Sequence, residues 1–84
     1  MVTVNLSESP LADLQTLEQY QGERPHVFPS IESGRWFVRT HREALAVGGA
    51  LLVIAGRQKI RPKLMDEYVV TAGREAAVRG KVAA

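Results

Sequence analysis

The chain has 84 residues and a mass of 9.2 kDa, which leaves room for one small domain. It has no cysteine, which excludes disulfide bonds and thiolate zinc sites, and only two histidines, His26 and His41. Its longest apolar stretch, residues 50–55, is too short to span a membrane. The N-terminus lacks the basic flank and apolar core of a signal peptide. We therefore expect a cytoplasmic protein with no metal site, no cofactor and no membrane partner.

The net charge of +2 is unevenly distributed. Residues 1–34 carry five acidic residues and one basic residue, whereas residues 35–84 carry ten basic and four acidic ones. Seven of those bases lie within residues 35–63, where Glu43 is the only acid. Such a concentration is typical of an anion-binding surface, and nucleic acid is the commonest anionic partner of so small a domain. A solvated basic face without any partner explains the charge count equally well.

Residues 1–9 carry mixed signals and are expected to form a mobile N-terminus. A first helix is predicted over about 10–21, because Ser9 is a good N-cap residue and Pro10 suits the first helical position. Apolar residues recur in it at a spacing of three, at Leu11, Leu14, Leu17 and Tyr20. Gly22 ends this helix, and a connector with two prolines leads to Pro29.

A second helix is predicted over about 31–47, between an N-cap at Ser30 and a stop at Gly48 and Gly49. At about 100° per residue, one face is expected to enter the core. That face consists of Phe37, Val38, His41, Ala44 and Leu45. The opposite face carries Arg35, Arg39 and Arg42, with Glu32 and Trp36 beside them. Three arginines without a lysine suit phosphates and guanine edges, although a solvated amphipathic helix is the simpler alternative.

Residues 51–60 predict a β-hairpin, because an apolar β-branched run is followed by Ala55 and Gly56, which supply the turn. In the return strand Ile60 is expected to face the core, while Lys59 and Arg61 face solvent. The tip of the hairpin, residues 56–59, is therefore predicted to be basic and exposed.

Pro62 begins a third predicted helix over about 62–72, which Gly73 caps. Its buried stripe is expected to contain Leu64, Met65, Tyr68, Val69 and Ala72. Residues 74–84 are alanine-rich and basic, and are interpreted as a tail that is either a helical extension or disordered.

No pairing of a nucleophile with a base can be identified, since the serines lie in N-terminal or capping positions. His41 is interpreted as a packed or hydrogen-bonded core residue. Trp36 is interpreted as half-buried at the helix margin, with contact to a base or sugar as the alternative. Catalytic residues are therefore not predicted, and the protein is not expected to be an enzyme.

The order helix, connector, helix, basic-tipped hairpin, helix predicts an α+β, mostly helical winged helix-turn-helix domain over residues 10–73. In such domains the second helix enters the major groove, and the hairpin touches the backbone or minor groove. The predicted contacts to double-stranded DNA from the recognition helix are Ser30, Glu32, Ser33, Arg35, Trp36, Arg39 and Arg42. Those from the wing are Arg57, Gln58, Lys59 and Arg61.

Three segments within residues 12–70 carry a family resemblance: residues 14–21 (LQTLEQYQ), 30–39 (SIESGRWFVR) and 53–60 (VIAGRQKI). With them the chain resembles the small excisionases, or recombination directionality factors, of phages and mobile elements. The resemblance implies base contacts from Glu32 and Arg39, a backbone contact from Arg35 and a core position for Phe37. It also implies a non-catalytic protein that binds tandem sites cooperatively, bends DNA and directs a tyrosine or serine integrase toward excision.

Two other functions fit the same sequence. A transcriptional regulator of a mobile element can use the same fold at a promoter. A protein-interaction module, such as a small anti-repressor, would instead dock its arginine face on an acidic protein. Self-association on DNA is expected for the excisionase, through the apolar residues 2–6 or the tail.

Overall fold

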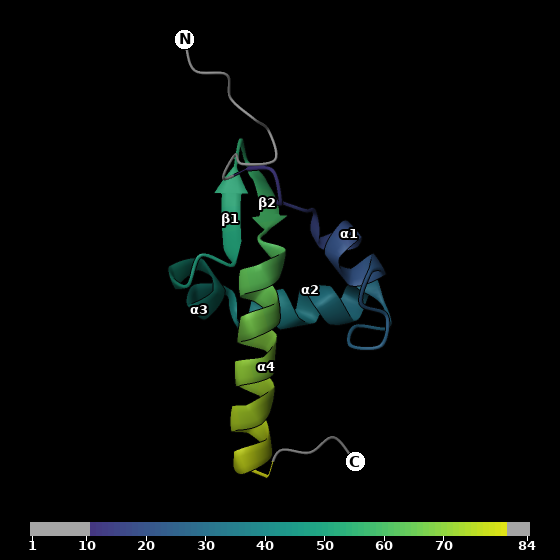
Figure 1. Ribbon diagram of the computed structural model, residues 1–84, viewed down its shortest axis with the longest axis vertical. Coiled ribbons are helices and arrows are strands. Elements are labelled where there is room, and N and C mark those ends of the chain that lie inside the picture. Colours follow the sequence, from purple (N-terminus) through teal and green to yellow (C-terminus); the bar gives the residue numbers. More distant parts are fainter. Residues whose placement is uncertain (1–10, 81–84) are drawn as a thin grey trace.

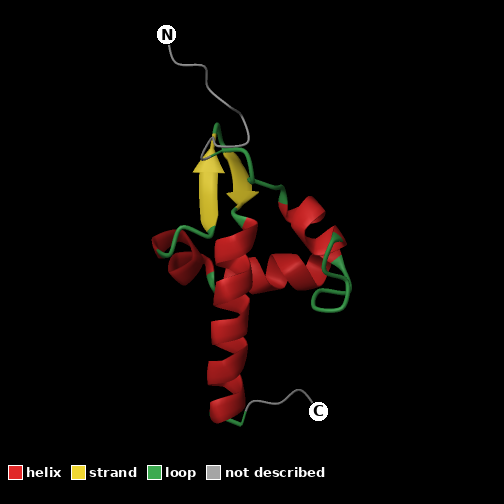
Figure 2. Ribbon diagram, in the orientation of Figure 1, coloured by secondary structure: helices red, strands yellow, loops and turns green. Residues whose placement is uncertain are grey.

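The computed structural model describes residues 11–80, which form a mostly helical α+β fold with a two-stranded antiparallel hairpin (Figures 1 and 2). The elements are α1 (Leu17–Gly22), α2 (Ile31–Thr40), α3 (Arg42–Val47), β1 (Leu51–Ile54), β2 (Arg57–Ile60) and α4 (Pro62–Val78). The mostly helical α+β class predicted from the sequence is confirmed, whereas the prediction for residues 1–9 lies outside the described residues. Within residues 11–80, no helix combines the length and apolar character needed to cross a membrane.

The first helix is shorter than the sequence predicted. It begins after Thr16, whose hydroxyl accepts from the Gln19 N–H at 3.1 Å while the Gln19 side chain accepts from the Thr16 N–H at 2.9 Å. This capping box fixes the start of α1. Upstream, Gln15 forms backbone hydrogen bonds of 2.9 and 2.7 Å with Ile60 of β2. The predicted helical structure before Thr16 is therefore wrong in the described range, and Leu11 is exposed rather than packed.

The predicted second helix is divided in two at His41, whose backbone angles of −112° and 20° lie outside the helical region. The His41 ring stacks on Phe37 with centroids 4.3 Å apart, and its Nδ1 lies 2.9 Å from the Tyr68 hydroxyl of α4. The interpretation of His41 as packed and hydrogen-bonded is confirmed. Because the chain turns at His41, the core-facing side predicted for residues 37–45 is only partly correct. Leu45 is fully buried, but Ala44 is exposed.

The hairpin has the predicted turn. Ala55 and Gly56 both have positive φ angles, 53° and 77°, as a two-residue type I′ loop requires. At the base of the hairpin Leu51 pairs with Ile60, and both are buried. Toward the tip the side chains of both strands are exposed, so the end of the hairpin projects beyond the core (Figure 1).

The last helix, α4, is longer than predicted. It begins at Pro62 as expected but passes through Gly73 and continues to Val78, so Gly73 does not cap it. Residues 74–77, Arg-Glu-Ala-Ala, are strong helix formers that offset the penalty of one glycine. In the described part of the predicted tail, the helical extension is therefore the correct alternative, and this end of α4 runs away from the other elements (Figure 1).

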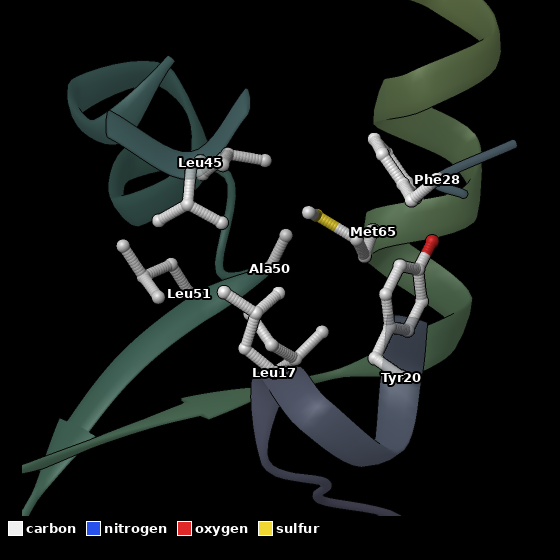
Figure 3. Close-up of a cluster of buried hydrophobic side chains, with 9 residues drawn as sticks. Leu17, Tyr20, Phe28, Leu45, Ala50, Leu51 and Met65 are labelled. Carbon is white, nitrogen blue, oxygen red and sulfur yellow. The ribbon is translucent and has the colours of Figure 1, made fainter. Parts of the chain in front are cut away.

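One hydrophobic core joins every element, and part of it is shown in Figure 3. Its members are Leu17, Tyr20, Phe28, Val38, Leu45, Ala50, Leu51, Ile60 and Met65. Phe37 and Tyr68 are only partly buried and pack against this core, with their rings 5.9 Å apart. The core contacts predicted for Val38, Leu45, Ile60 and Met65 are confirmed.

A polar cluster ties the end of α1 to α4. The Tyr20 hydroxyl donates to Asp66 Oδ1 at 2.6 Å, and Arg24 donates from Nε and Nη2 to the two oxygens of Asp66 at 2.7 and 3.1 Å. The Arg24 guanidinium also lies over the Tyr20 ring, 3.9 Å from its centroid. Hydrogen bonds from Arg24 hold the pKa of Asp66 below its usual value. Burial and the hydrogen bond to Asp66 raise the pKa of Tyr20.

We expect Asp66→Asn to lower the free energy of unfolding by about 1 kcal/mol at pH 7, since the amide keeps an acceptor for Tyr20 but loses the charge that binds Arg24. The pKa of Asp66 is lower in the folded than in the unfolded chain. Its charge therefore contributes fully above the unfolded value, and the contribution is lost as the pH falls through the folded value. Urea unfolding should show the gap between the two proteins closing as the pH falls below the ordinary carboxyl pKa of 3.8. A gap of constant size would contradict this role for Asp66.

Gly73→Ala provides a test of the length of α4. A Cβ at Gly73 meets nothing within 4 Å, so alanine should strengthen the helical signal at 222 nm and raise the free energy of unfolding by up to about 1 kcal/mol. The matched control is Gly56→Ala, which also meets nothing within 4 Å but has a positive φ of 77°. That variant should lose about 1 kcal/mol. If Gly73 ended the helix as a left-handed cap, both substitutions would destabilise the protein.

Candidate functional site

A groove of about 550 Å³ lies between α2, the start of α3 and strand β2. Five cationic side chains line it: Arg35, Arg39, Arg42, Arg57 and Lys59. The other lining residues are Thr16, Leu17, Glu18, Val38 and Gln58. Three elements that are separate in the sequence thus bring their positive charges to one concave surface, which we call the cationic groove.

The core sets the position of each wall of the cationic groove. On α2, Val38 is buried in the core, whereas Arg35 and Arg39 are exposed at the surface. On β2, Ile60 is buried at the base, and the strand carries Arg57 outward to the exposed tip. Each wall therefore has an apolar anchor at its base and basic groups facing the groove.

Arg35 is held by two carboxylates. Its Nη2 lies 3.8 Å from Glu18 Oε2 of α1, and its Nη1 lies 3.9 Å from Glu32 Oε2 one turn earlier on α2. In the described part of the chain, the other four cations of the groove have no carboxylate oxygen within 4 Å. The groove therefore presents an excess of uncompensated positive charge, which favours an anionic ligand.

The structure brings together most of the predicted site residues but not all of them. Arg35, Arg39, Arg57, Gln58 and Lys59 line the cationic groove as one set. Arg42 lines it as well, although it belongs to α3 rather than to the same helix as Arg35 and Arg39, because the chain turns at His41. Arg61 does not line the groove.

Arg61 is instead a structural residue at the start of α4. Its backbone N–H donates to the Ala50 carbonyl at 2.9 Å, and its Nη1 lies 3.8 Å from Asp13 Oδ1. Only 26% of its side chain is exposed. The prediction that Lys59 and Arg61 both face solvent is wrong in degree, because both residues are partly buried. For Arg61 the strand ends at Ile60, and the alternation of faces ends with it.

The remaining predicted residues lie at the start and on the side of α2. Ser30 and Ser33 form a capping box, in which each hydroxyl accepts from the other's N–H at 3.3 Å. Glu32 is exposed and does not line the groove. Trp36 is 58% exposed, so it lies on the surface rather than half-buried at the helix margin.

Sequence reasoning missed the contribution of α1 to the groove. Thr16, Leu17 and Glu18 form part of its lining, and all three lie where α1 begins. The spacing of Thr16 and Gln19 was the available signal, because a threonine followed three residues later by glutamine is typical of a helix start. The helix predicted from about residue 10 places Thr16 and Gln19 in its interior, so their spacing is not identified as a helix start.

Residues 11–80 show no cluster of metal-ligating side chains. They contain no group of three or more histidine, aspartate or glutamate side chains that could hold a metal ion. Comparison of the chain with family models, with characterised proteins and with solved structures gave no match. The assignment of a function therefore depends on the cationic groove itself.

Proposed function

We propose that this protein is a non-catalytic DNA-binding protein of the winged helix-turn-helix type, in which α2 is the recognition helix and the β1–β2 hairpin is the wing. The observation that carries the proposal is the cationic groove, where α2, α3 and β2 direct five positive side chains toward one space. A wing beside the exposed face of a recognition helix is the arrangement that lets such domains contact two grooves of one duplex.

In this proposal the exposed face of α2 enters the major groove. Arg39 and Glu32 contact base edges, since a guanidinium suits guanine and a carboxylate accepts from the cytosine amino group. Trp36, which is exposed on the same helix, contacts a sugar or base. The N-terminus of α2, capped by Ser30 and Ser33, lies close to the phosphates, where its backbone N–H groups and dipole favour an anion.

The wing supplies contacts that do not depend on sequence. Arg57, Gln58 and Lys59 line the cationic groove of the protein together with α2. On DNA they would therefore meet the phosphates between the major and minor grooves, or the walls of the minor groove. The wing and α2 thus have different roles, since phosphate contacts position a protein on DNA while base contacts give specificity.

The first test is the salt dependence of binding to a random 20-base-pair duplex. Four or five neutralised phosphates correspond to a slope of about −4 for the logarithm of the binding constant against that of the salt concentration. Arg57→Ala combined with Lys59→Ala should make this slope shallower by about 2 and weaken binding at least tenfold.

The matched control removes two charges from outside the groove. Arg74→Ala combined with Arg79→Ala changes the net charge equally but alters residues near the far end of α4, and it should leave the slope unchanged. Equal effects of the two double variants, or a wild-type slope near zero, would mean that the groove is not the DNA interface.

Within this proposal the particular role is that of an excisionase, which the resemblance of residues 12–70 supports. Such a protein would bind tandem sites beside an integrase target, associate with neighbouring copies and bend the DNA. Bending costs about 1–6 kcal/mol, more than so small an interface offsets alone, so that neighbouring copies would share the cost.

A recombination assay in cells tests that role. With its cognate tyrosine or serine integrase, the protein should raise excision of the element and not raise integration. If excision is unchanged while a nearby promoter responds, the protein is a transcriptional regulator with the same fold. If duplex DNA is not bound at all and an acidic protein is, the arginine face is a protein-docking surface.

A further inference from the structure

The cationic groove contains one acidic side chain among its lining residues, Glu18. Its carboxylate does not cap α1, because the Thr16 and Gln19 side chains form the capping box. It lies instead 3.8 Å from Arg35, with 67% of its side chain exposed. The only acid of the groove is therefore directed at one of its five cations.

Arg35 differs from the other four cations in this respect. Within residues 11–80, Arg39, Arg42, Arg57 and Lys59 have no ion pair with a carboxylate, whereas Arg35 has two, with Glu18 and Glu32. The two acids are not equivalent. Glu32 approaches from within α2 and is not part of the groove lining, whereas Glu18 reaches across from α1 and does line the groove. A phosphate bound to Arg35 in the groove would therefore lie beside the Glu18 carboxylate.

We propose that Glu18 is an internal competitor of DNA phosphate for Arg35, and that it lowers the affinity of the protein for DNA backbone of any sequence. This inference rests on the proposed function, since it assigns a role within the same groove. To bind a phosphate, Arg35 must leave Glu18, and the phosphate must then lie near an unpaired carboxylate. Like charges brought together at an interface weaken binding, and natural interfaces use such repulsion to reject unwanted partners.

The consequence is a lower affinity for every duplex, so that weak backbone contacts alone are less able to hold the protein on DNA. The unfavourable contact with Glu18 is the same on every duplex, because every duplex has the same phosphates. Only a sequence that offers favourable base contacts to α2 compensates for it. Glu18 is therefore a residue that sets the overall affinity for DNA without touching a base, acting through the charge of its neighbour.

The test compares Glu18→Gln with the wild-type chain on a random 20-base-pair duplex, over a range of salt concentrations. Glutamine is nearly the same size, and the charge of Glu18 is not part of the helix cap. The variant should bind random duplex about fivefold more tightly at 0.1 M salt. The slope against salt should become more negative by about 0.9, since Arg35 then displaces the counterion of one further phosphate.

Two controls separate this mechanism from a simple change in net charge. Glu67→Gln removes the same charge from an exposed position on α4 that does not line the groove, and it should change binding by less than twofold. In an Arg35→Gln background, the gain from Glu18→Gln should disappear, because the contested cation is absent. Thermal unfolding of each variant verifies that the fold is retained.

The outcomes are distinct. Equal gains from Glu18→Gln and Glu67→Gln, or a gain that persists without Arg35, would overturn the role of Glu18 while leaving the DNA-binding function intact. A wild-type chain that does not bind duplex at low salt would overturn the proposed function, and this inference with it.

Discussion

The arrangement of the groove depends on how Ile60 is held. Its side chain is fully buried, its backbone exchanges two hydrogen bonds with Gln15, and across the hairpin it pairs with Leu51. β2 is therefore bonded on both sides at this point, by β1 and by the segment that leads into α1. Because Leu17 follows Gln15 closely and belongs to the same core, this one position fixes the hairpin relative to α1. Arg57 and Lys59 consequently face the start of α1 and the exposed side of α2.

A second constraint acts from the other side of α2. Phe37, His41 and Tyr68 form a stacked and hydrogen-bonded cluster that joins the end of α2 to α4. The ring of Phe28 extends it toward Tyr20, with centroids of Phe28 and Phe37 5.5 Å apart. The turn at His41 ends α2 and starts α3 at Arg42, and Arg42 faces the groove rather than continuing along α2. The third arginine thus lines the cationic groove from α3, although α2 ends before it.

The sequence predicted the structural features that depend on residues close together in the chain. It did not predict the features that depend on contacts between distant residues. The hairpin turn followed from Ala55 and Gly56, and the start of α2 from its serines, because both are local requirements of backbone geometry. The division of the second helix could not be foreseen, since it involves Tyr68, which lies 27 residues further on. The strand-like pairing of Gln15 likewise depends on Ile60, and the leucine spacing in that region favoured a helix. For the site, the residue types pointed to a basic surface, but only the fold shows that Glu18 shares it.

The fold also separates two kinds of arginine that no sequence pattern distinguishes. Arg24 and Arg61 have side chains only 19% and 26% exposed, and each contacts an aspartate that is distant in the sequence, Asp66 or Asp13. Their charges are neutralised within the protein and hold its elements together. Four of the five cations of the groove are exposed and Lys59 is partly buried, and all but Arg35 lack a carboxylate partner in the described chain. The repulsion among them opposes folding to a small extent, and an anion bound between them relieves it. Within residues 11–80, Glu18 is the only acid that lines the groove, and the groove therefore keeps an excess of positive charge.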